Sequence, residues 1–200
     1  MSVNLQHWIF DMDGTLTVAV HDFQLIRREL GVPQGEDILG YLARLPEAES
    51  AQKHAWLLEH ERELALASKP AAGIKSVLEL LRDRGVKLGI LTRNARDLAH
   101  ITLEAAGLDE FFPVEWILGR DEAAPKPKPD GILHLAAEWS VPPSEVLMVG
   151  DNYLDLAAAR NAGAPNILLV AGDNRWPEWR DVHLQNAASL ERLIAGVNCF

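Results

Sequence analysis

The chain has 200 residues, which suits one compact domain that carries a modest insertion. It is 48% hydrophobic and 24% charged, an ordinary globular balance with enough apolar material for a core. A formal net charge of −10 argues against free binding to nucleic acid or to an anionic membrane. No stretch approaches the roughly 20 apolar residues of a membrane span, so we expect no membrane partner.

The N-terminal segment and the cysteine usage bear on location. MSVNLQHWIF has no basic region followed by a long apolar one, so we expect no signal peptide. The single cysteine, Cys199, has no second cysteine with which to form an internal disulfide, and this fits a reducing compartment. We therefore expect a cytoplasmic protein. Nothing in the sequence demands an oligomer, so we expect a monomer.

Short apolar runs alternate with helical patterns along most of the chain. Because the runs are continuous rather than alternating, they are typical of strands that are covered on both faces. The expected strands cover residues 8–10, 86–91, 114–118, 146–149 and 167–170. The expected helices cover residues 74–84, 95–106, 130–138, 154–162 and 188–194. Gly85, Gly107 and Gly163 follow three of these helices, as C-caps do. The alternation predicts an α/β fold with a doubly wound parallel sheet between layers of helices.

Residues 18–72 interrupt this alternation because they contain no convincing strand. Three helical patterns fill the segment instead, over residues 23–30, 37–45 and 47–68. In the third pattern apolar residues recur a heptad apart, as at Leu57 and Leu64, which is typical of an amphipathic helix. The segment is either a helical decoration on the sheet or a small lid above the end of the first strand.

Polar or charged residues directly follow four of the expected strands. In chain order they are Asp11 and Asp13, then Thr92, Arg93 and Asn94, then Lys126 and Lys128, then Asp151 and Asp155. Taken singly, each group is typical of ordinary turn, cap or loop chemistry. The carboxyl ends of parallel strands share one edge of the sheet, where ligands bind in doubly wound folds. We therefore expect the four groups to converge there.

Together these residues favour phosphoryl chemistry. Asp11, Asp13 and Asp151 would surround a divalent cation, and Mg2+ prefers oxygen ligands, waters and phosphate. The cation would offset the repulsion between Asp11 and Asp13, since like charges that close raise each other's pKa. Thr92 and a lysine would hold phosphate oxygens, and a carboxylate would attack phosphorus to form an aspartyl-phosphate.

The segments IFDMDGTLT, LTRN, PKPKPD and VGDNYLD resemble, in this order, the four motifs of the haloacid dehalogenase (HAD) superfamily. The agreement spans residues 8–164. The resemblance implies a Rossmann-like core of residues 1–17 and 73–200. It also implies a short helical cap of residues 18–72, in a hydrolase similar to the phosphoglycolate phosphatases.

The resemblance also implies roles for the motif residues. Asp11 would be the nucleophile, and Asp13 would be the general acid and then the general base. The side chains of Asp11 and Asp151 and the backbone carbonyl of Asp13 would bind Mg2+. Asp155 would lie behind these ligands or reach a metal-bound water.

Four further residues would bind the phosphoryl group. Thr92 would donate a hydrogen bond to it, with Arg93 and Asn94 beside it. Lys126 would neutralise charge on the nucleophile and on the phosphoryl oxygens. Family spacing of the Lys-Pro-x-Pro type favours Lys126 over Lys128 for this role.

The second aspartate separates phosphoryl transfer from dehalogenation, because a leaving alkoxide needs a proton that Asp13 can give. We therefore predict a Mg2+-dependent phosphatase that hydrolyses a small phosphorylated metabolite. A phosphomutase shares the first half-reaction, and the motifs do not separate the two. A non-catalytic binding or regulatory protein that retains the fold is a third alternative, and the intact motif set argues against it.

Some residues keep two interpretations. His21 is either an ordinary helix-start residue or a substrate contact at the cap hinge. Arg27, Arg28 and Arg93 are either solvated or bind a substrate carboxylate. The WPEW segment, Trp176–Trp179, either packs the last part of the chain onto the core or presents a surface to a partner.

Overall fold

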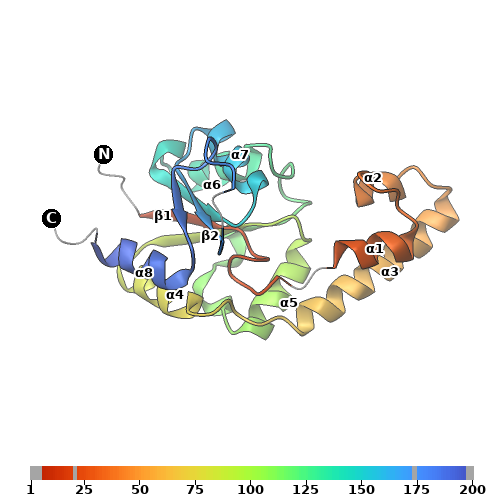
Figure 1. Cartoon of the computed structure of the whole chain (residues 1–200), viewed down its shortest axis with the longest axis horizontal. Coiled ribbons are helices and arrows are strands. Elements are labelled where there is room, and N and C mark those ends of the chain that lie inside the picture. The colour runs from red at the N-terminus through yellow and green to blue at the C-terminus, as the bar shows by residue number, and fades with distance from the viewer. Residues whose placement is uncertain (1–5, 20–21, 173–174, 197–200) are drawn as a thin grey trace.

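The computed structural model of the protein describes residues 6–19, 22–172 and 175–196. These residues form two lobes of unequal size (Figure 1). The larger lobe holds a six-stranded sheet with helices on both faces, and the smaller lobe consists of three helices. His21 lies outside the described residues. Within the described ranges, every helix is too short or too polar to cross a lipid bilayer.

All pairings in the sheet are parallel, and the spatial order is β3-β2-β1-β4-β5-β6. The strands are β1 (His7–Phe10), β2 (Lys87–Leu91), β3 (Ile117–Leu118), β4 (Val146–Gly150), β5 (Asn166–Leu169) and β6 (Val182–Leu184). The strand order reverses beside β1, which pairs with both β2 and β4. The predicted doubly wound parallel sheet is confirmed, and its reversal point marks where such sheets bind ligands.

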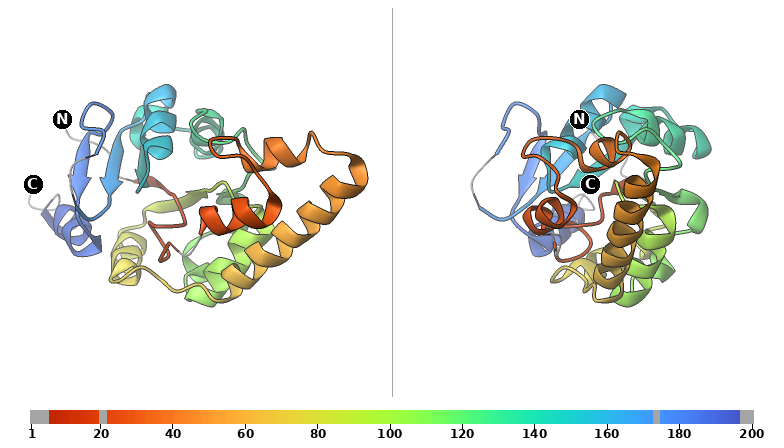
Figure 2. Two further views of the ribbon diagram at one scale, coloured as in Figure 1. Left: turned by 45° about the vertical axis from the view of Figure 1, so that its right-hand side comes forward. Right: turned by 90° about the vertical axis from the view of Figure 1, so that its right-hand side faces the viewer.

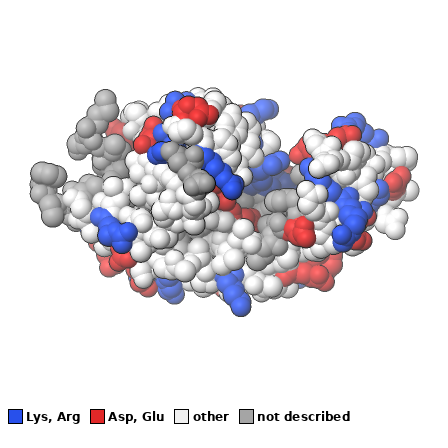
Figure 3. All heavy atoms as spheres, viewed as in Figure 1, with Lys and Arg blue, Asp and Glu red and all other residues white. Residues whose placement is uncertain are grey.

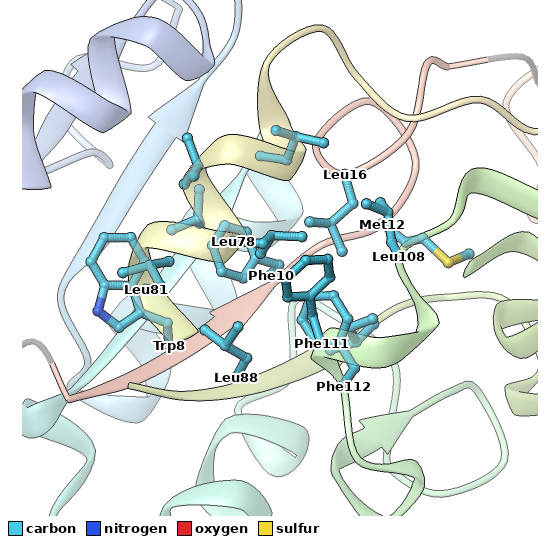
Figure 4. Close-up of a cluster of buried hydrophobic side chains, with 14 of the residues drawn as sticks. Trp8, Phe10, Met12, Leu16, Leu78, Leu81, Leu88, Leu108, Phe111 and Phe112 are labelled. Atoms are coloured by element: carbon cyan, nitrogen blue, oxygen red, sulfur yellow. The ribbon is translucent and has the colours of Figure 1, made fainter. Parts of the chain in front are cut away.

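Successive side chains of β1 point to opposite faces of the sheet, as the pleat requires. Trp8 and Phe10 join one apolar cluster, and Ile9 joins another. The first cluster lies under α4 (Ile74–Asp83), α5 (Arg96–Ala106) and α8 (Ala187–Gly196), and the second lies under α6 (Asp130–Glu138) and α7 (Tyr153–Ala162). Figure 4 shows the first cluster, where Phe10 lies among Leu78, Phe111 and other side chains. Burial on both faces explains why the strands are continuous apolar runs.

Two strands differ from the sequence prediction. Residues Val114–Trp116 form a 3-10 helix, η2, rather than the start of a strand, because Trp116 N donates to Pro113 O at 2.9 Å and closes a turn. The strand proper is only β3, Ile117–Leu118. The edge strand β6 was not predicted, because its three residues are half-buried and include His183. Two further 3-10 helices are η1 (Asp109–Phe111) and η3 (Pro143–Glu145).

The smaller lobe, here called the three-helix lobe, comprises α1 (Phe23–Leu30), α2 (Ile38–Leu42) and α3 (Glu47–Leu66). Carboxylates cap its first two helices: Asp22 Oδ1 accepts from Leu25 N at 2.9 Å, and Asp37 Oδ2 accepts from Gly40 N at 2.8 Å. The lobe has an apolar cluster of its own, formed by Ile26, Leu30, Val32, Leu42 and Leu57. Local capping and a separate core therefore hold these helices together.

Two chain segments join the lobes, and they run side by side. Val18 N donates to Lys69 O at 3.0 Å, and Ala71 N donates to Leu16 O at 2.9 Å. Between them Thr17 forms an antiparallel bridge with Pro70. Helix α3 also contacts α5, so the three-helix lobe leans on the sheet domain along one side (Figure 2).

Candidate active site

A cleft of about 350 Å3 lies between the carboxyl edge of the sheet and the three-helix lobe. Figure 3 shows a hollow between the two lobes, with Lys and Arg atoms on both sides of it. Of the nine polar residues that the sequence places after the strands, all but Lys128 line this one cleft: Asp11, Asp13, Thr92, Arg93, Asn94, Lys126, Asp151 and Asp155. The volume falls in the low part of the range of about 300–1,000 Å3 that is typical of small-molecule sites.

Lys126 lies at the bottom of the cleft between two carboxylates. Its Nζ is 2.5 Å from Asp11 Oδ1 and 2.6 Å from Asp155 Oδ1. The side chains of Lys126 and Asp155 are 3% and 1% exposed, so the ammonium is almost wholly desolvated. By contrast, Lys128 is exposed and lies outside the cleft lining.

Helix α7 holds this arrangement in place. Asp155 lies in its first turn, where its Oδ2 accepts from Asn152 N at 3.1 Å as half of a capping box. In the last turn of the helix, Asn161 Nδ2 donates to Pro127 O at 2.9 Å and holds the residue next to Lys126 in place. Asp155 therefore caps a helix and orients Lys126 with the same carboxylate.

Asp13 is held from the neighbouring strand. Asn94 Nδ2 donates to Asp13 Oδ2 at 2.8 Å, and Asn94 N donates to Thr92 Oγ1 at 3.2 Å. Thr92 is buried at the end of β2, where its backbone N–H donates to Leu118 O of β3 at 3.0 Å. The turn after β2 thus fixes the side chain of Asp13, which comes three residues after the end of β1.

Two glycines make room for the carboxylates. A Cβ on Gly14, whose φ is +88°, would lie 2.4 Å from Asp151 Oδ2. A Cβ on Gly150 would lie 2.3 Å from the carboxyl carbon of Asp155. Any other residue at either position would displace a carboxylate of the site.

Burial and like charge perturb the carboxylates. Burial raises the pKa of Asp11, although the Lys126 ammonium opposes the rise. Burial, with the Asp11 charge adding to it, raises the pKa of Asp151 to about 6. Burial likewise raises the pKa of Asp155 to about 7 against the pull of Lys126. The two carboxylates raise the pKa of Lys126 despite its burial, so the lysine stays charged.

The donor set at this end of the cleft suits a hard divalent cation. Carboxylate oxygens of Asp11, Asp151 and Asp155 lie within 4.8 Å of one another. With Asp13 they place four carboxylates around a single ammonium, and oxygen donors of this kind are those that Mg2+ prefers. The side chain of Asp13 is not part of this close group, and the motif resemblance implies a metal contact only for the backbone carbonyl of this residue.

Several arginines lie at the other end of the cleft. Arg93 Nη2 is 3.4 Å from Asp37 Oδ1 of the three-helix lobe, and Arg120 contacts Glu61 of α3 at 3.4 Å. Arg27 lines the cleft from α1, whereas its neighbour Arg28 is 72% exposed and lies outside the lining. Sequence reasoning missed Arg120 and Glu61, because no local motif surrounds them and only the fold brings them to the cleft.

The Trp176–Trp179 segment packs against α7. The Trp179 ring meets Tyr153 edge-on, with ring centroids 5.0 Å apart. Arg160 Nε and Asn166 Nδ2 both donate to Trp179 O, at 3.0 and 3.2 Å. The sequence left open whether this segment packs onto the core or presents a surface to a partner. The contacts of Trp179 show packing onto the core.

A doubly wound sheet with carboxylates and a buried lysine at its carboxyl edge is the arrangement of an α/β enzyme. Residues 6–163 match the family model described as haloacid dehalogenase-like hydrolase, and the chain belongs to this family. The resemblance drawn from the four motifs is thereby confirmed.

Individual relatives agree with the family assignment. The chain is 28% identical to an uncharacterized hydrolase of Saccharomyces cerevisiae over 198 residues, which cover 95% of this chain and 91% of that protein. It is 31% identical to a phosphoglycolate phosphatase of Thiobacillus denitrificans over 193 residues, with 84% of each chain covered. A solved hydrolase from Pseudomonas syringae has a TM-score of 0.75 at 26% identity and covers 96% of this chain and 98% of its own.

Proposed function

We propose that the protein is a Mg2+-dependent phosphatase that hydrolyses a small phosphorylated metabolite through an aspartyl-phosphate on Asp11. The observation that carries the proposal is the placement of Asp11 against Lys126, with Asp13 held by Asn94 in the same small cleft. The relative from Thiobacillus denitrificans, which is named a phosphoglycolate phosphatase, supports phosphate-ester hydrolysis as the reaction class.

The reaction consists of two in-line transfers. A carboxylate oxygen of Asp11 attacks phosphorus, and the bond to the leaving oxygen breaks while Asp13 gives that oxygen a proton. Asp13, now ionised, then takes a proton from a water that attacks phosphorus, which releases phosphate and restores Asp11. Lys126 and Thr92 stabilise negative charge on the phosphoryl oxygens throughout.

Two carboxylates, Asp11 and Asp151, together with the backbone carbonyl of Asp13, would hold the metal ion. A bound divalent cation offsets the excess of carboxylates over ammonium and lets a dianionic phosphate enter an acidic site. Asp155 contacts Lys126 directly, so its role in this proposal is to orient the lysine and to add negative charge beside the metal ligands.

Residues 18–72 act as a cap over a core of residues 1–17 and 73–200 in this proposal. The separate apolar cluster of the three-helix lobe supports such a division, as do the two paired connecting segments at Thr17 and Pro70. Side chains from this lobe, among them Ile26 and Leu57, line the cleft, so the lobe contributes to the choice of leaving group. Cytoplasmic location and a monomeric state stay predictions.

The test is phosphate release from a panel of phosphorylated metabolites by the wild type and by Asp11→Asn, with Mg2+ and with EDTA. Asn has the shape of Asp but cannot form a stable acyl phosphate, so we expect release that needs Mg2+ and is lost in the variant. Retention of activity by Asp11→Asn would refute the mechanism. Isomerised sugar phosphate without free phosphate would assign the protein to the phosphomutases instead.

A further inference from the structure

The two ends of the cleft differ in charge. At the sheet end, Asp11, Asp13, Asp151 and Asp155 surround the single cation Lys126. At the lobe end, three arginines face two carboxylates, and the five residues are Arg27, Arg93, Arg120, Asp37 and Glu61. The lobe end therefore carries a formal charge of +1, against −3 at the sheet end before any cation binds.

Arg27 and Arg120, at the lobe end, form no short ion pair with a carboxylate of the described residues. Arg120 reaches both carboxylate oxygens of Glu61, but every nitrogen–oxygen distance is 3.4 Å. A well-formed charge-assisted bond is about 2.7–2.9 Å long. Arg27 donates to the carbonyl of Pro33 at 3.0 Å, and no carboxylate of the described residues lies within ion-pair distance of it. Donor capacity therefore remains at this end, whereas Lys126 already directs two of its three N–H donors to carboxylates at 2.5 and 2.6 Å.

Arg120 is placed by the same residue that positions the proposed acid. Its backbone N–H donates to Asn94 O at 2.9 Å, and the side chain of Asn94 holds Asp13. Gly119 permits this approach, since a Cβ there would lie 2.5 Å from Asn94 O. The Arg120 side chain is 21% exposed and that of Glu61 is 13% exposed, so a charge in this region is only partly screened by water.

We propose that Arg27 and Arg120 form a second anion-binding subsite, which selects short phosphate esters whose leaving group carries a further anionic group. The inference rests on the proposed phosphatase function and names its substrate class. The planar guanidinium is suited to bidentate contact with a carboxylate or a phosphate. The ligand anion replaces Glu61 on Arg120, and because Arg27 belongs to the three-helix lobe, the ligand also bridges the two lobes.

The chemistry of the cleft limits the rest of the leaving group. Besides the arginines, the lobe end is lined by the apolar side chains of Ile26, Ile38, Leu39 and Leu57. A volume of about 350 Å3 has to hold the phosphoryl group, the connecting atoms and the second anion. The substrate class is therefore a small ester with a short, largely apolar connection between its two anionic ends.

The test compares three phosphate esters of equal chain length that end in a methyl, a carboxylate or a second phosphate. Each is assayed with the wild type and with Arg27→Gln and Arg120→Gln. We expect the wild type to prefer one anionic ester by about tenfold or more in kcat/KM. In each variant the KM for that ester should rise about 10- to 100-fold with a smaller change in kcat. Whichever ester is preferred identifies the second group as a carboxylate or a phosphate.

Two further variants guard against a general effect on folding. Arg28→Gln is the matched control on the same helix, because Arg28 is 72% exposed and outside the cleft, and it should keep the wild-type preference. Glu61→Gln removes the competing carboxylate, so it should lower the KM for the anionic ester about two- to fivefold. A gain of affinity cannot come from loss of folded protein.

Each outcome decides a different point. Equal kcat/KM for all three esters in the wild type would overturn the subsite while leaving the phosphatase proposal intact. An equal loss for all three esters in Arg27→Gln and Arg120→Gln would also overturn it. Failure to hydrolyse any phosphate ester would overturn the proposed function itself, and the subsite with it.

Discussion

Replacing Lys126 by methionine removes one charge from the most buried ionic contact of the site. Methionine keeps most of the length of the side chain but leaves Asp11 and Asp155 without the ammonium that lies 2.5 and 2.6 Å from them. The Asp155 side chain is only 1% exposed, so water does not replace its lost partner, whereas that of Asp11 is 12% exposed at the cleft. In the variant, the carboxylates of Asp11 and Asp155 therefore lose the ammonium that contacts both of them.

The size of the effect follows from the burial. Removing one partner of a buried ion pair destabilises a protein by about 3–5 kcal/mol, out of a total stability of about 5–15 kcal/mol. The cost depends on pH, because a carboxylate that takes up a proton no longer needs the cation. Without Lys126 the pKa of Asp155, already raised to about 7, rises further. We therefore expect the full loss at pH 8 and a much smaller loss at pH 5.

Urea unfolding of metal-free protein at both pH values measures the loss. Lys128→Met is the matched control, since Lys128 is exposed in the same loop and should change stability by less than about 0.5 kcal/mol. The loss in Lys126→Met should correspond to a Tm lower by roughly 6–20 °C at pH 8. A loss below about 1 kcal/mol at pH 8, or an equal loss at both pH values, would refute the reasoning from buried charge.

Two other predictions concern the same carboxylates. Asn94→Ala removes the donor that holds Asp13 Oδ2 at 2.8 Å, so kcat for phosphate release should fall about 10- to 100-fold while the unfolding midpoint changes little. An unchanged kcat would show that Asn94 does not position the acid. The second prediction concerns pH: Asp151 and Asp155 have pKa values raised to about 6 and 7, so the folded state holds protons that the unfolded chain releases near pH 4. Stability of the metal-free protein should therefore fall as the pH rises from about 4 to 7, and Mg2+ should raise Tm more at pH 8 than at pH 5. A Tm that does not change with pH, or an Mg2+ effect that is equal at both values, would contradict this.

Much of the fold could be predicted from local patterns. A strand buried on both faces must be apolar throughout, so β1, β2, β4 and β5 were recognisable as runs, each to within about one residue. Gly107 and Gly163 adopt left-handed φ values of 64° and 75° at the ends of α5 and α7, as the sequence indicated. Where the local signal is weak, prediction failed: β6 is short and half-buried, and a turn after Pro113 replaced the start of β3.

The candidate site divides in the same way. Each group of motif residues follows a strand, and parallel strands place their carboxyl ends at one edge, so the sequence itself determined that Asp11, Thr92, Lys126 and Asp151 would meet. The helices within residues 18–72 could also be predicted from the sequence, because helix caps and the spacing of apolar residues are local features.

Only the tertiary structure decided which side chains touch. The contacts of Lys126 with Asp155, of Asn94 with Asp13 and of Arg120 with Glu61 join residues 29, 81 and 59 positions apart. Such pairs depend on the register between strands and on the way the three-helix lobe leans on α5, and no spacing within a motif encodes either. Short segments of the chain therefore determine which chemical groups the site contains. The orientation of these groups, and the charge at the lobe end of the cleft, depend on how the segments pack against one another.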